Sequence, residues 1–173
     1  ETGARMKMLK EAVSKSVKAV GIQEGIAHVE LSITDNGPVL FEIGARCGGG
    51  APSPLVPFLS GVHEFKEAVR IALGQRPFHL EPLHEKACVI RFFYPRPGIV
   101  KSIRGAEKAS KIPGILSFGI FVKPGQRVRP LKTCSDRAGM VIAGADTRDK
   151  ALRIATEAIN TVTIETIPCE SND

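Results

Sequence analysis

The chain has 173 residues, of which 43% are hydrophobic and 24% are charged, and it carries a formal net charge of +6. This composition is that of an ordinary globular protein, and no apolar run approaches the roughly 20 residues that span a bilayer, so no membrane partner is expected. The basic residues are spread along the chain and aromatic residues make up only 5% of it, which argues against nucleic-acid binding.

The first elements are a helix and a hairpin. Residues 4–20 alternate apolar and lysine positions at three- and four-residue steps, which predicts an amphipathic helix that Gly21 ends. Residues 27–33 and 39–43 then alternate with a period of two on either side of Asp35-Asn36-Gly37, which predicts a β-hairpin. Its expected core face consists of Ala27, Val29, Leu31, Ile33, Val39, Phe41 and Ile43.

A glycine-rich loop at residues 46–50 and a stretch containing Pro52, Pro54 and Pro57 lead to a helix predicted over residues 62–73. We expect this helix to pack with the first helix and the hairpin into a stable core. Residues 76–85 contain two prolines and look like a connector.

The remaining residues predict a small α/β unit, with four strands and two helices. The strands are expected at about residues 86–94, 98–104, 115–122 and 137–143, and the helices at about 105–111 and 147–160. Helices and hairpins alternate without a clear βαβ rhythm, so the class predicted for the whole chain is α+β.

Two glutamates face each other in the predicted hairpin. Both apolar sets point to one core only if the turn is a three-residue loop of Asp35, Asn36 and Gly37, with glycine at the left-handed position. That register places Glu30 directly opposite Glu42, with Cβ atoms roughly 4.5–5.5 Å apart. Since opposed like charges destabilise a ladder, a positive group is expected between them.

A hard divalent cation suits this pair, because magnesium typically binds one or two carboxylates together with substrate phosphates. Arg46 adds a fixed cation for a phosphate or a developing oxyanion, and the glycines after it allow a ligand to approach the backbone. The alternative from the residues alone is a polar hairpin face whose charges are merely solvated.

The motifs Gly25-Ile26-Ala27-His28-Val29-Glu30, Asp35-Asn36-Gly37 and Phe41-Glu42-Ile43-Gly44-Ala45-Arg46 resemble the C-terminal lobe of ATP-grasp enzymes over about residues 4–75. The resemblance implies that Glu30 and Glu42 bind Mg²⁺ (or Mn²⁺) that bridges the phosphates of ATP. It also implies that Arg46 is the catalytic arginine and contacts phosphate.

The Arg-x-Gly-Gly run looks most like the branch of L-amino acid ligases, in which Gly48 and Gly49 would line the pocket for the carboxylate substrate. His28 shares the glutamate face and is a candidate substrate-binding residue, although a packed or solvent-bridging histidine fits the pattern equally well. The family usually has asparagine as a further metal ligand where this sequence has Gly44.

The resemblance implies three segments: a C-terminal ATP-grasp lobe at residues 1–75, the connector at 76–85 and a small α/β subdomain at 86–173. The phosphate-binding lysines and adenine hinge of the family's first lobe do not precede the first helix. We therefore expect a C-terminal portion that folds but does not catalyse without its N-terminal ATP-grasp lobe.

The function predicted on this basis is an ATP- and Mg²⁺-dependent ligase that joins a small-molecule carboxylate to an amine through an acyl phosphate. The alternatives are a carboxylase-type ATP-grasp enzyme that activates bicarbonate, and a non-catalytic module for homodimerisation or for covering the substrate. Cys47, Cys88, Cys134 and Cys169 are widely spaced without a Cys-x-x-Cys pair, and we expect reduced thiols in a cytoplasmic protein.

Overall fold

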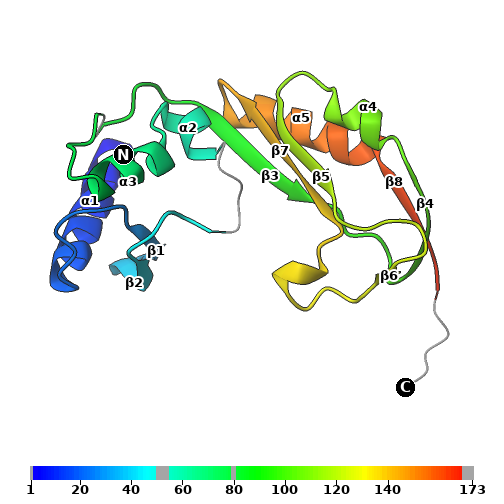
Figure 1. Cartoon of the computed structure of the whole chain (residues 1–173), viewed down its shortest axis with the longest axis horizontal. Coiled ribbons are helices and arrows are strands. Elements are labelled where there is room, and N and C mark those ends of the chain that lie inside the picture. Colours follow the sequence, from blue (N-terminus) through cyan, green and yellow to red (C-terminus); the bar gives the residue numbers. More distant parts are fainter. Residues whose placement is uncertain (1, 50–54, 79–80, 169–173) are drawn as a thin grey trace. The chain divides into compact units, whose positions relative to one another are not determined.

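The structure is a computed structural model that describes residues 2–49, 55–78 and 81–168 (Figure 1). Four residues named above lie outside the described residues: Gly50, Pro52, Pro54 and Cys169. The chain divides into two compact units, and each is described by itself. Unit 1 comprises Glu1–Pro57 with Val62–Leu83, and unit 2 comprises Phe58–Gly61 with His84–Asp173.

Unit 1 contains the predicted first helix and hairpin. Helix α1 (Thr2–Ala19) packs against β2, and Gly21 follows it with φ 77°, a left-handed conformation that favours glycine at a helix end. Strands β1 (His28–Thr34) and β2 (Gly37–Gly44) form a two-stranded antiparallel sheet. The predicted elements are confirmed here.

The turn of this hairpin differs from the prediction. Thr34 pairs with Gly37, so the turn has two residues, and the pairing shifts between Glu30 and Leu31 so that Phe41 has no opposed partner. This β-bulge turns Phe41 out of the expected core face and leaves it 72% exposed. Between the bulge and the turn the faces of β2 are also exchanged, since Leu40 lies opposite Leu31 and the exposed Val39 lies opposite Ser32. The three-residue loop and the core positions of Val39 and Phe41 were therefore wrong.

The helix predicted at residues 62–73 is present as α3 (Glu64–Ala72), and a further short helix precedes it. Helix α2 (Leu55–Ser60) was missed, and Pro57 is tolerated in it because proline suits the first turn of a helix. Helix α3 (Glu64–Ala72) follows, and the buried Glu67 carboxylate accepts a hydrogen bond of 2.8 Å from the backbone N–H of Phe78. This bond ties the segment after α3 back to the helix.

The packed core of unit 1 is smaller than expected. Phe65 and Val69, two large apolar residues of α3, are both exposed. Among the described residues, the fully buried hydrophobic side chains all belong to unit 2. The expectation of a core built from α1, the hairpin and α3 is corrected accordingly.

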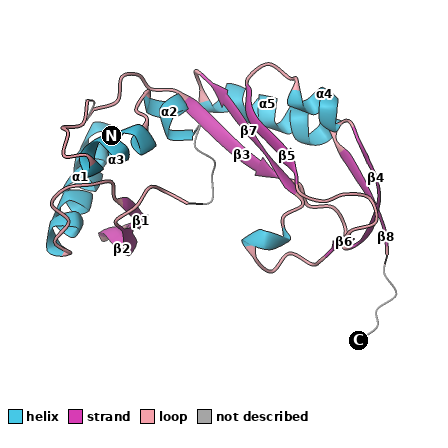
Figure 2. Cartoon of the chain, in the orientation of Figure 1, coloured by secondary structure: helices cyan, strands magenta, loops and turns pink. Residues whose placement is uncertain are grey.

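Unit 2 contains two three-stranded antiparallel sheets, which Figure 2 shows in magenta with helices α4 (Ala106–Ser110) and α5 (Arg148–Thr161) in cyan. The first sheet has the order β3 (Ala87–Phe92), β7 (Gly139–Ala145), β5 (Ile115–Ile120). The second has the order β6 (Arg127–Val128), β4 (Gly98–Arg104), β8 (Thr163–Ile167). Strands β6 and β8 were not predicted. The α+β class is confirmed.

The core of unit 2 lies where α5 crosses β3 and β7. Ala151, Ala155 and Ala158 are fully buried, and their small side chains let the helix backbone approach the central strand closely. Val141 and Ala143 of β7 complete this cluster. Thr147 begins α5 as its N-cap and accepts a hydrogen bond from the N–H of Lys150.

Candidate functional site

The β1–β2 hairpin brings the predicted site residues together. Glu30 lies directly opposite Glu42, and His28 lies opposite Gly44. The opposition predicted for the two glutamates is present although the turn is shorter than predicted, because the bulge at Phe41 adds one residue to β2 before Glu42. The bulge therefore restores the register at the end of the hairpin that carries these charges.

Each carboxylate has a different hydrogen-bond partner. His28 Nε2 lies 3.0 Å from Glu30 Oε1, and Arg46 Nη2 donates to Glu42 Oε1 over 2.8 Å. The side chains of Glu30 and Glu42 remain 56% and 51% exposed. The positive group expected between the glutamates is thus supplied on one side by Arg46, while both carboxylates stay accessible to a ligand.

Arg46 folds back over the end of β2. A Cβ atom added at Gly44 would lie 3.1 Å from Arg46 Nε, so the space of a side chain at position 44 is taken by the arginine. A second guanidinium bond, from Nη1 to the carbonyl oxygen of Cys47 at 3.1 Å, fixes the group further. Arg46 therefore lies close to position 44, where this chain has glycine in place of the asparagine that the resemblance implies. The sequence did not predict this close approach.

Two glycines after Arg46 also border the site. A Cβ at Gly48 would lie 3.2 Å from His28 Nδ1, and a Cβ at Gly49 would lie 3.7 Å from Arg46 Nη1. The structure therefore places all six predicted site residues in one neighbourhood: His28, Glu30, Glu42, Arg46, Gly48 and Gly49. Within residues 2–49, 55–78 and 81–168, no group of three or more His, Cys, Asp or Glu side chains is arranged to hold a metal ion.

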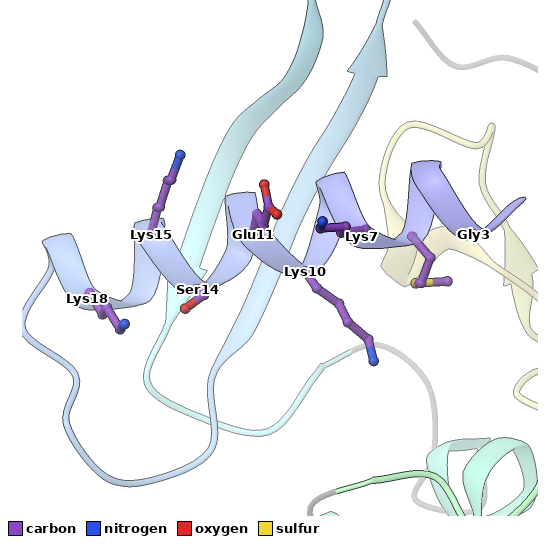
Figure 3. A pocket seen from close by; sticks show the side chains of 8 residues that line it. Gly3, Lys7, Lys10, Glu11, Ser14, Lys15 and Lys18 are labelled. Carbon is purple, nitrogen blue, oxygen red and sulfur yellow. The ribbon is translucent and has the colours of Figure 1, made fainter. Parts of the chain in front are cut away.

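A second group of basic residues in unit 1 does not converge. A groove of about 650 Å³ runs along α1 and is lined by residues of that helix alone. Figure 3 shows that Lys15 extends to the side of the helix opposite to Lys10 and Lys18. Because these ammonium groups diverge, the hairpin face is the better candidate for a site.

Comparisons with known proteins show what the chain is similar to. Residues 91–166 match the family described as L-amino acid ligase C-terminal domain 2. Dapdiamide A synthase of Enterobacter agglomerans is 29% identical over 136 residues, which cover 75% of this chain and 32% of the relative. Over residues 91–166 the chain is therefore similar to a C-terminal domain of L-amino acid ligases, and over a longer stretch it is similar to dapdiamide A synthase.

Solved ATP-grasp structures have the same fold. L-amino acid ligase from Bacillus licheniformis superposes with a TM-score of 0.78 at 20% identity, covering 95% of this chain and 41% of that one. Phosphoribosylglycinamide synthetase from Anaerococcus prevotii superposes with a TM-score of 0.81 at 21% identity, covering 94% and 42%. The chain spans 32–36% of the length of the curated relatives that it matches.

The family match lies over residues 91–166, whereas the candidate site residues lie in the β1–β2 hairpin and the loop after it, in unit 1. Cys47 adjoins the site as a free thiol, and Cys88 and Cys134 in unit 2 are also free. Burial raises the pKa of the Cys88 thiol, which keeps it protonated and unreactive. Among the described residues, no helix has the length and apolar character needed to cross a membrane.

Proposed function

We propose that the hairpin face binds the magnesium ions that bridge the phosphates of ATP in a carboxylate–amine ligase. The observation that carries this proposal is the opposition of Glu30 and Glu42 with both side chains half exposed. Opposed carboxylates repel each other unless a cation lies near both, and magnesium uses one or two protein carboxylates together with phosphate oxygens and water.

The donor set fits such an ion. The hydrogen bonds to His28 and Arg46 both involve an Oε1 atom, and a carboxylate has enough acceptor capacity to bind a metal as well. Two protein carboxylates leave most of an octahedral coordination shell to phosphates and water, which is typical of magnesium in nucleotide sites. Mn²⁺ has the same preference for carboxylate and water ligands and would serve in its place.

Arg46 is proposed to stabilise negative charge on the transferring phosphoryl group or on the acyl intermediate. Its planar guanidinium offers several donors, and its bond to Cys47 oxygen holds it near the end of β2. In the proposed reaction a small-molecule carboxylate attacks the γ-phosphorus of ATP to give an acyl phosphate and ADP. An amine then displaces phosphate, which forms the amide bond.

The glycines of the loop support a substrate pocket beside the metal. Gly48 lies close to His28 and Gly49 close to Arg46, and because glycine carries no side chain a carboxylate substrate could approach the backbone between these groups. The names of two relatives, an L-amino acid ligase and dapdiamide A synthase, support this ligase class. The catalytic contribution would consist of positioning and electrostatic stabilisation.

Water proton relaxation with Mn²⁺ tests the proposal on this chain. We expect the wild type to bind Mn²⁺ and the double variant Glu30→Gln, Glu42→Gln to lose that binding. Glu107→Gln is the matched control, because Glu107 is an exposed carboxylate of α4 that pairs with Lys111. Equal Mn²⁺ enhancement in the wild type and the double variant would contradict the assignment.

A further inference from the structure

A small basic hollow lies beside β6 in unit 2, apart from the residues assigned above. It has a volume of about 330 Å³, and its charged lining residues are Arg127, Arg129, Asp136 and Arg137. We propose that this arginine hollow, defined by these four residues, binds a compact oxyanion, namely a single phosphate or carboxylate group of a small molecule. The proposal is independent of the metal site on the hairpin.

Two of the arginines flank Val128, Arg127 within β6 and Arg129 directly after it. Val128 lies between them and is 6% exposed, whereas Arg127 and Arg129 are exposed. Because side chains two residues apart share a face of an extended chain, burial of Val128 directs both guanidinium groups outward together. The backbone is held by pairing with β4, in which Gly98 lies opposite Val128 and Ile99 opposite Arg127.

Arg137 is held from the other side of the hollow. Its guanidinium carbon lies 3.9 Å from the centre of the Phe92 ring, and the next residue, Ala138, is buried and donates its N–H to the Phe93 oxygen. Contact of the ring with the flat face of a guanidinium leaves the N–H groups at its edge available. Arg137 is thus positioned without using the donors that would bind an anion.

Asp136 offsets only one of the three positive charges. Its Oδ2 accepts hydrogen bonds from the N–H groups of Lys132 and Thr133 and from Thr133 Oγ1, at 2.8–3.1 Å. These bonds form the cap of the short helix Cys134–Asp136 and lower the pKa of the carboxyl, so Asp136 stays ionised for a structural reason. Its other oxygen lies 3.7 Å from Arg129 Nε, which helps to orient that guanidinium.

The balance of charge favours an anion of limited size. Three guanidinium groups against one carboxylate leave an excess of two positive charges around the hollow. Planar guanidinium groups bind the oxygens of phosphate or carboxylate in pairs, and the small volume suits one such group rather than a polymer.

The test uses inorganic phosphate and acetate as separate probes, with ionic strength held constant by sodium chloride. Amide chemical shifts of residues 126–137 should change with saturation as phosphate or acetate is added. A response to phosphate alone identifies a phosphate ligand, and a response to acetate alone identifies a carboxylate ligand. If neither probe gives saturable shifts in this segment, the proposal is overturned.

Substitutions distinguish specific anion binding in the arginine hollow from a non-specific attraction of anions to a basic protein. Arg129→Gln should weaken binding of the responding anion about 10- to 100-fold, since a hydrogen bond to a charged group contributes about 1.5–3 kcal/mol. Arg153→Gln is the control, because Arg153 is exposed on α5 and does not line the hollow. Equal loss of affinity in Arg129→Gln and Arg153→Gln would overturn the proposal. Unchanged affinity in the double variant Arg127→Gln, Arg129→Gln would also overturn it. Native amide spectra confirm that each variant is folded.

Discussion

Arg46 donates a hydrogen bond of 2.8 Å to Glu42, and its side chain occupies the space beside Gly44. The guanidinium and a metal ion would therefore both be partners of the same carboxylate. The asparagine that the resemblance to ATP-grasp enzymes implies for position 44 would need the same space. Arg46 thus contacts both the space at Gly44 and Glu42, which is a proposed metal ligand. A change at position 44 should therefore affect metal binding through Arg46.

Gly44→Asn tests this connection. The new side chain needs the space of the Arg46 stem, whose far end is flexible and can move, and it adds an amide oxygen next to Glu42. We expect tighter Mn²⁺ binding than in the wild type by relaxation titration, because the variant gains a ligand and frees Glu42 from its guanidinium partner. Gly44→Ala is the control that displaces Arg46 without adding a ligand, and equal affinity in both variants would show that the amide oxygen does not bind the metal.

Arg46 itself should matter for turnover rather than for folding. In a ligase that contains this region with the remaining ATP-grasp segments, Arg46→Ala should lower the rate of amine-dependent ADP formation about 100- to 1000-fold, as loss of a preorganised transition-state contact does. Stability should change by less than about 1 kcal/mol, because the ion pair to Glu42 is half exposed. Arg46→Lys should remain slow, since an ammonium group lacks the planar fork. A rate within threefold of the wild type would mark Arg46 as a surface charge only.

Gly48 should control the orientation of His28. A methyl group at position 48 would lie 3.2 Å from His28 Nδ1, which is tight, whereas a methyl group at position 49 would make an ordinary contact of 3.7 Å with Arg46. Gly48→Ala should therefore disturb the 3.0 Å contact between His28 and Glu30, and Gly49→Ala should not. The ¹⁵N chemical shifts of the His28 ring report this difference. Identical ring shifts in the two variants would mean that the loop does not constrain His28.

The hairpin shows how far sequence patterns reach. Alternation with a period of two located both strands and the opposition of Glu30 and Glu42. The shorter turn and the bulge at Phe41 compensate each other at Glu42, and neither was predictable. Hydrophobic alternation counts Val39 and Phe41 as core residues, whereas a bulge exchanges the faces of the residues between it and the turn. Hydrophobic alternation predicts the face on which a residue lies if the strand pairing is regular. It does not predict whether the pairing contains a bulge.

Other elements were missed for different reasons. Thr163–Ile167 carries β-branched residues directly after a helix, a strand signal that was present in the sequence. Leu55–Ser60 was hidden by Pro57, although proline in a first turn is compatible with a helix. The arginine hollow depends on residues from β6 and from the segment before β7, and no local pattern predicts that tertiary juxtaposition.

Gly105 should be the less replaceable of two left-handed glycines in unit 2. Both Gly105 and Gly125 have positive φ, 81° and 84°, but a Cβ at Gly105 would collide with the carbonyl oxygen of Thr161, whereas open space surrounds Gly125. Gly125→Ala should cost only about 1–2 kcal/mol for the left-handed backbone. Gly105→Ala should cost more, because the end of α5 must also move. Denaturant unfolding of both variants measures this difference, and equal losses would show that the backbone of Thr161 yields freely.

Acid should weaken unit 2 through Glu165 and Asp136. Hydrogen bonds from Lys101 and Ser102, together with the charges of Lys101 and Arg104, lower the pKa of Glu165, and backbone hydrogen bonds from Thr133 and Lys132 lower that of Asp136. A carboxyl with a lower pKa in the folded state stabilises the fold above its unfolded pKa, near 3.9 for Asp and 4.3 for Glu, and this contribution is lost as pH falls through the folded pKa.

The free energy of unfolding of the wild type should therefore fall as pH drops below about 4.3, the ordinary pKa of a glutamate. Glu165→Gln and Asp136→Asn should each make that fall shallower, because an amide does not titrate and each variant has already lost its carboxylate at neutral pH. Denaturant unfolding at a series of pH values between neutrality and this acid range measures the slope. Glu107→Gln, which removes an exposed carboxylate paired within α4, is the matched control. A slope flattened equally by Glu107→Gln would mean that acid acts through total charge rather than through the hydrogen bonds of Glu165 and Asp136.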